Sequence, residues 1–76
     1  MNPKRRNSLD VAVTHLEQAK GIIETAKDEV QDGLDNMPES LQDSERCEKM
    51  ETAIDLLDDA ISDIESAIDH VGNAKE

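Results

Sequence analysis

A seven-residue repeat of large and small apolar residues runs through almost the whole chain. In the first half a large apolar residue recurs every seven positions from Leu9 to Met37, and Ala or Gly follows three positions after each of the first four. The second half repeats this arrangement from Met50 to Ala74. Spacings of three and four, kept over several turns, are typical of helices that meet along a seam. The repeat therefore predicts two long amphipathic helices that pack closely through alanine and glycine.

Capping and breaking residues set the expected limits of these helices. Ser8, or Asn7 before it, is a favourable N-cap, and Pro38 disfavours helical backbone at the residue before it. Gly72 and Asn73 are typical of a helix end. The predicted fold is all-α, a single antiparallel hairpin domain at 8–73 with the tight packing of an Ala-coil. Its expected parts are a basic flexible leader at 1–7, a helix at 8–34, a connector at 35–43, a helix at 44–71 and a frayed tail at 74–76.

The second half has a wider apolar face than a two-helix contact needs. The related segments AIDLLDD, AISDIES and AIDHVGN place Ile54, Ile61 and Ile68 beside the seam. Lys20 and Lys27 stand at two of the matching positions in the first half. The apolar surface left over predicts self-association into a four-helix bundle or a larger helical oligomer, with the three isoleucines as the interface. The alternative is a monomeric hairpin with an apolar flank.

Charge and composition exclude several classes of function. The chain has 19 acidic and 8 basic residues, a formal net charge of −11, no aromatic residue and one cysteine. Direct nucleic-acid binding is disfavoured, because it needs clustered cations and aromatic stacking platforms. No signal peptide and no membrane span is recognisable, so we expect no membrane partner and a cytoplasmic location, in the protein's own cell or in that of a host that it enters.

The clearest charged feature is an acidic stripe along one side of the second helix. No Lys or Arg occurs between Met50 and Ala74. Carboxylates three or four residues apart on a helix lie about 5–6 Å from one another, which favours mimicry of a DNA backbone aimed at a basic groove. The alternative is a solvated face that keeps an oligomer in solution. The acidic stripe consists of Glu51, Asp55, Asp58, Glu65 and Asp69.

No constellation of residues predicts catalysis or metal binding. Residues 28–39 have some spacing of a calcium-binding EF-hand loop, but Val30 occupies a ligand position and Pro38 precedes the final Glu. His15, His70 and Cys47 have no partners at metal-ligand or nucleophile spacing. We therefore expect a non-enzymatic protein with no catalytic residue, no metal and no cofactor.

Basic residues offer an alternative function as a sponge for a small cyclic-nucleotide signal. In this hypothesis pockets form between the subunits of an oligomer, and basic side chains neutralise the phosphates. The net charge and the lack of aromatic residues count against it. The candidate phosphate contacts are Lys4, Arg5, Arg6, Arg46 and Lys49.

The connector carries a resemblance to known proteins. The segment NMPESLQDSER at 36–46, followed by METAI at 50–54, resembles short acidic helical proteins encoded by phages and mobile elements of Gram-positive bacteria. The resemblance implies a phage setting, where small non-enzymatic proteins block a host defence by binding one of its components, and it assigns no functional residue. The leading hypothesis is therefore an inhibitor that binds a host protein through the acidic stripe. The alternatives are the nucleotide sponge and a simple oligomerisation or scaffold module.

Overall fold

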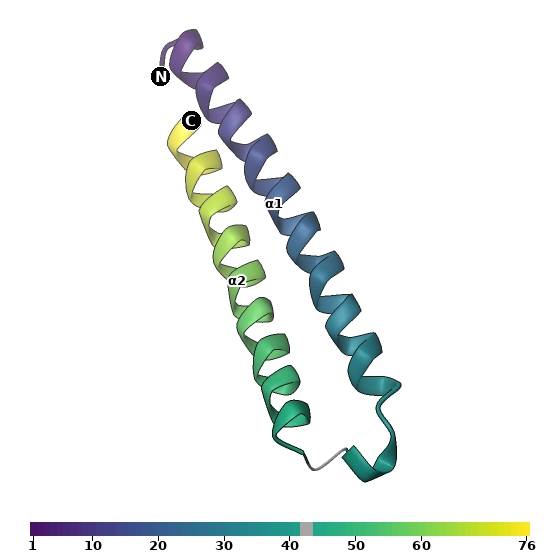
Figure 1. The fold of residues 1–76 in the computed structure, drawn as a ribbon. Helices are drawn as coiled ribbons and strands as arrows, with labels where there is room; N and C mark the ends of the chain where they lie inside the picture. Colours follow the sequence, from purple (N-terminus) through teal and green to yellow (C-terminus); the bar gives the residue numbers. More distant parts are fainter. Residues whose placement is uncertain (42–43) are drawn as a thin grey trace.

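Two long helices make up nearly all of the described structure. The computed structural model describes residues 1–41 and 44–76, with α1 at Pro3–Asp35, a short 3-10 turn η1 at Glu39–Leu41, and α2 at Glu45–Lys75. The two helices lie side by side and run antiparallel, so that both chain termini are at the same end (Figure 1). The molecule is a rod with extents of 60 × 14 × 12 Å. The predicted all-α helical hairpin is confirmed.

Helix α1 begins five residues before the predicted start at Ser8. The side chain of Asn2 caps it by accepting a hydrogen bond of 2.8 Å from the backbone N–H of Arg5. Pro3 follows at the first helical position, where its missing N–H costs nothing. The guanidinium of Arg6 donates to the carbonyl oxygen of Lys75 at 3.3 Å, which joins the first turn of α1 to the last turn of α2. The leader expected to be flexible is therefore helical from Pro3.

The ends of α2 also have identifiable causes. The hydroxyl of Ser44 accepts the backbone N–H of Cys47 at 3.3 Å, and Glu45 and Glu48 place negative charge in the first turn, where the helix dipole favours it. At the other end α2 continues through Gly72 to Lys75, four residues past the predicted end. No described glycine has the positive φ of a helix terminator, so Gly72 acts as an ordinary helical residue. Residues 42–43 of the predicted connector lie outside the described residues.

The hairpin has a half-buried seam and almost no enclosed core. Among the described residues only Cys47, at 4% exposure, is buried. Two helices enclose few side chains, so apart from Cys47 the apolar contact is spread along the rod and stays partly open to solvent. Near the connector the side chain of Met50 reaches α1, where a Cβ on Gly33 would lie 2.9 Å from its terminal methyl. The half-buried large apolar residues of the repeat are Leu9, Leu16, Ile23, Val30, Met37, Met50, Leu57, Ile64 and Val71.

Candidate partner-binding surfaces

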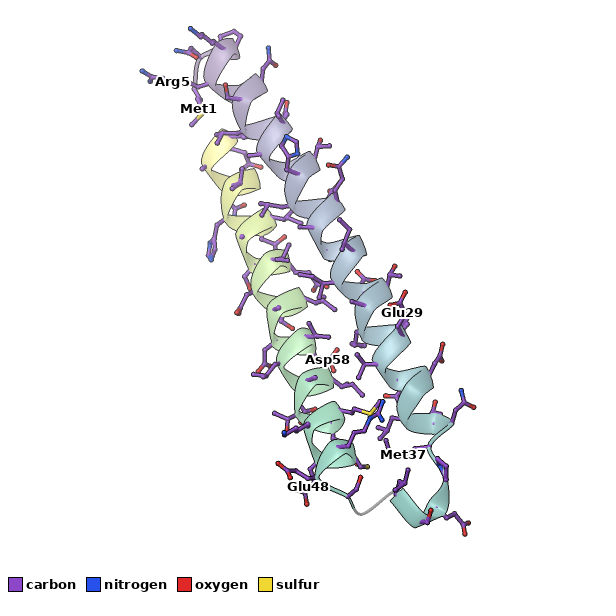
Figure 2. All side chains as sticks on the ribbon, viewed as in Figure 1. Met1, Arg5, Glu29, Met37, Glu48 and Asp58 are labelled. Carbon is purple, nitrogen blue, oxygen red and sulfur yellow. The ribbon has the colours of Figure 1, made fainter. Side chains whose placement is uncertain are left out.

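Among the described residues, three ion pairs connect the two helices. The ammonium of Lys20 lies 3.2 Å from a carboxylate oxygen of Glu65, and that of Lys27 lies 2.6 Å from one of Asp58. Near the open end of the hairpin, Lys75 and Asp10 form the third pair at 2.5 Å. Figure 2 shows Asp58 on the side of α2 that faces α1. These pairs are half-exposed, so each contributes modestly to stability, but together they fix the register of the helices at several levels.

The ion pair between Lys27 and Asp58 changes the pKa of the lysine. The hydrogen bond to Asp58, and then the negative charge of the same carboxylate, raise the pKa of Lys27 above the ordinary 10.5. The neighbouring Asp28 and Glu24 act in the same direction, while partial loss of solvent opposes them. Lys27 therefore remains charged across the neutral range, and Asp58 always faces a cation at physiological pH.

The structure divides the predicted acidic stripe into two parts. Asp58 and Glu65 are neutralised by lysines of α1, and Glu51 accepts a weak hydrogen bond from the thiol of Cys47 at 3.6 Å. Asp55 and Asp69 are exposed, and neither joins an ion pair within residues 1–41 and 44–76. The stripe is therefore not a uniformly negative surface, because the edge nearest α1 is mixed in charge.

Unpaired carboxylates continue around α2, away from α1. Glu51, Asp55, Asp59 and Asp63 follow one another at intervals of four residues and are all exposed. We call these four residues the outer acidic face. No ion pair in the described part of the chain includes any of them. The spacing of the residues could have predicted which carboxylates are paired with lysines. Lys20 and Lys27 are seven residues apart, as are Asp58 and Glu65, so two ion pairs can form between the antiparallel helices.

The predicted oligomer interface is already partly used inside the hairpin. Ile54, Ile61 and Ile68 are each half-buried. Larger apolar exposure occurs elsewhere on the helices, at Ile22 with 71% exposed and Leu56 with 63%. Sequence reasoning missed these two because they lie off the repeat, each one residue before a seam position. An interface at the three isoleucines remains a prediction.

The candidate phosphate contacts lie at both ends of the rod. Lys4, Arg5 and Arg6 are in the first turns of α1, at the open end, whereas Arg46 and Lys49 are in the first turns of α2, beside the connector. Figure 2 shows this separation through Arg5 and Glu48. The molecule is 60 Å long, and Lys49 already pairs with Glu45 at 3.3 Å. One chain therefore does not bring these five side chains to a single ligand.

Neither a metal cluster nor a membrane span is found in the described residues. Within 1–41 and 44–76, no group of three or more His, Cys, Asp or Glu side chains is arranged to hold a metal ion. None of the helices there has a stretch both long and apolar enough to cross a bilayer.

Comparison of this chain with known proteins finds no match. No protein-family model, no curated protein and no solved structure matches this chain. The resemblance carried by residues 36–54 thus remains an expectation from the sequence, and the functional argument rests on the surfaces described above.

Proposed function

We propose that this chain is a non-enzymatic binding protein that attaches to a basic surface of another protein through the outer acidic face of α2. The observation that carries the proposal is the unbroken series Glu51, Asp55, Asp59 and Asp63, exposed and without a cation in the described structure. Like charges four residues apart on a helix destabilise it by about 0.2–0.5 kcal/mol per pair. The hairpin accepts that cost repeatedly on this face, although no ion pair within residues 1–41 and 44–76 offsets it there.

The position of the available cations supports the same conclusion. Lys20 and Lys27 lie on the flank where they pair with Glu65 and Asp58, and no lysine or arginine of α2 stands between Met50 and Ala74. A surface meant only for solubility would serve as well with mixed charges. A face of one sign instead favours a partner of the opposite sign, through steering and through ion pairs that form on contact.

The partner that fits this face has a groove lined with Lys and Arg. Four residues of α-helix rise about 6 Å and turn about 40° beyond one full turn, so the outer acidic face is a row of evenly spaced negative charges that winds slowly around α2. A nucleic-acid backbone presents the same kind of array to the proteins that bind it. The face is therefore suited to occupy a DNA-binding groove of a host protein. The resemblance of the connector to phage-encoded proteins implies a phage setting. In that setting such a protein would act in the host cytoplasm as an inhibitor of a host defence factor.

Affinity capture from an extract of a Gram-positive bacterium, followed by mass spectrometry, tests this proposal. Three forms of the chain are compared: the wild type, a variant with Asp55→Lys, Asp59→Lys and Asp63→Lys, and a control with Glu17→Lys, Asp28→Lys and Asp32→Lys on α1. The two variants change the net charge equally, so a difference between them reports the position of the charge. Circular dichroism checks that both remain helical.

The expected result is a DNA-binding protein that the wild type and the control retain and the α2 variant loses. Added duplex DNA should compete with the chain for this protein, because both occupy the same groove. Equal retention by all three forms would contradict the proposal. So would equal loss from both variants, or a captured protein whose DNA binding is unaffected by the chain.

A further inference from the structure

The side of α1 that points away from α2 has a pattern of its own, separate from the seam. Its members alternate at intervals of four and three residues, and all of them are exposed. Between Ser8 and Thr25 no member carries a formal charge, in a chain where 36% of residues are charged. We call this set the α1 outer face. It consists of Lys4, Ser8, Val11, His15, Gln18, Ile22, Thr25 and Glu29.

The order of residue types along the α1 outer face is symmetric about the middle of the face. Counted inward from the two ends, a cation matches an anion, a hydroxyl matches a hydroxyl, a branched apolar side chain matches another, and a neutral polar residue matches another. The spacing of four, three, four, three, four, three, four is also symmetric. The matched pairs are Lys4 with Glu29, Ser8 with Thr25, Val11 with Ile22, and His15 with Gln18.

We infer that the α1 outer face binds the same face of a second copy of this chain, antiparallel and related by a two-fold axis. Such an axis, placed midway between Lys4 and Glu29, brings every matched pair to the same level along the two helices. Val11 then packs on the partner's Ile22, beside a shallow groove that is lined by Gln18, Gly21, Ile22 and Thr25. Two hairpins joined in this way form a four-helix arrangement with the two α1 helices at its centre.

The amount of surface left open by the hairpin supports a second copy. The chain exposes 5615 Å². A compact monomer of this mass exposes about 4,600 Å², so the hairpin has roughly 1,000 Å² more surface than a globular protein of its size. A standard protein interface covers about 800 Å² on each partner. One contact of this size along α1 would therefore reduce the exposed surface of each chain to about that of a compact monomer of the same mass.

Charge selects both this face and the direction of pairing. Each copy has a formal net charge of −11, so two copies repel unless they meet where charge is absent. Antiparallel pairing also places Lys4 of each copy near the partner's Glu29. Neither residue joins an ion pair among the described residues, so both are available for that contact. Parallel pairing would instead oppose lysine to lysine and glutamate to glutamate.

The two hydroxyl groups of the face can be covered without losing their hydrogen bonds. The hydroxyl of Ser8 donates to the carbonyl oxygen of Lys4 at 3.2 Å, and that of Thr25 donates to the carbonyl oxygen of Gly21 at 3.1 Å. Both donors are therefore satisfied within α1. A second helix laid over them buries a methyl or methylene group rather than an orphaned donor, which is the condition for burying a polar side chain at low cost.

Sedimentation equilibrium of the full chain tests the presence and position of this contact. The wild type should be a dimer in reversible equilibrium with the monomer. Ile22→Asp should raise the dissociation constant at least about tenfold, because the two-fold axis introduces two charged side chains into the interface at once. Leu56→Asp is the matched control, an equally drastic change at an exposed apolar position of α2, and should leave the dissociation constant unchanged. A wild type that stays monomeric, or an equal effect of both variants, would overturn the inference.

Exchange of the terminal charges tests the direction of pairing. Lys4→Glu and Glu29→Lys should each weaken the dimer, because each places like charges together at both ends of the contact. The double variant should restore the wild-type dissociation constant, since it exchanges the partners of the same ion pair. Rescue by the double variant supports antiparallel pairing through this face. Additive weakening in the double variant would contradict it, and it would do so independently of any result for the outer acidic face of α2.

Discussion

The two helices share one seam but differ completely on the sides they turn away from each other. The α1 outer face carries no charge between Ser8 and Thr25, whereas the outer acidic face of α2 carries a carboxylate every four residues from Glu51 to Asp63. The seam places half-buried apolar residues on both helices in the same rhythm. The hairpin is the fold that the shared repeat predicts, and the faces outside the repeat are the surfaces on which the two proposed contacts rest.

The flank between these two faces explains how one chain can carry both. Lys20 and Lys27 lie there and neutralise Glu65 and Asp58 on α2. These two lysines are thus used at the junction between the helices, and the α1 outer face carries no charge between Ser8 and Thr25. The same pairing leaves the carboxylates farther around α2 without cations. Charge is in this way sorted into a neutral face suited to another copy and an acidic face suited to a basic partner.

The largest expected effect comes from two adjacent isoleucines of α1. Ile23 is half-buried in the seam, whereas Ile22 is 71% exposed. Ile23→Ala should lower the free energy of unfolding by about 2 kcal/mol, the low end for an isoleucine that loses its packing. Ile22→Ala should change it by no more than about 0.5 kcal/mol. Urea denaturation of dilute protein, where the monomer dominates, measures both, and equal losses would mean that the seam is misplaced.

Glycines on the two sides of α1 should respond differently to a methyl group. A Cβ on Gly21 would meet nothing within 4 Å, so Gly21→Ala should raise the free energy of unfolding by about 0.5–1 kcal/mol through the helix preference of alanine. On Gly33 it would lie 2.9 Å from the terminal methyl of Met50, which must move, so the gain should be smaller. Thermal denaturation monitored by circular dichroism compares them. A larger gain at Gly33 would argue against this contact between Gly33 and the side chain of Met50.

A smaller effect should appear in the pH dependence of the ion pair at Lys27. Asp58 raises the pKa of Lys27 in the folded chain above the ordinary 10.5. The stability that this pair contributes is therefore fully present below pH 10.5 and is lost as the pH rises through the raised pKa. The melting temperature of the wild type should exceed that of Lys27→Met at neutral pH, and the difference should shrink in strong alkali. Lys49→Met, at a pair within α2, serves as the control and should show a smaller difference at neutral pH.

The sequence was sufficient for the fold because the seam depends on a local and repeated property. Residues spaced by three and four identify the buried side of each helix without knowledge of its partner, and Pro38 separates the two helices. The start of α1 was predicted at Ser8, whereas the cap in the structure is Asn2, a residue type equally favourable at that position. Arg6 contacts the last turn of α2, and such a contact between the two ends of the chain cannot be read from local sequence.

The surfaces were harder to predict because they depend on how the two helices are aligned. Lys20 can face several carboxylates of α2, and only the register of the hairpin selects Glu65. The acidic stripe consequently included two residues that are neutralised in the fold. The exposure of Ile22 was missed for a related reason: it neighbours a seam residue, and a search for the seven-residue repeat passes over it.

The central claim, that α1 and α2 present surfaces of different kinds, is tested most directly by nuclear magnetic resonance of labelled protein over a concentration series. Between micromolar and millimolar chain, the backbone amide signals of Val11, Gln18 and Ile22 should shift together as copies associate. The signals of Asp55 and Asp59 should stay in place, since the outer acidic face takes no part in that contact. Shifts concentrated on α2, or no shift on α1 at any concentration, would contradict the account.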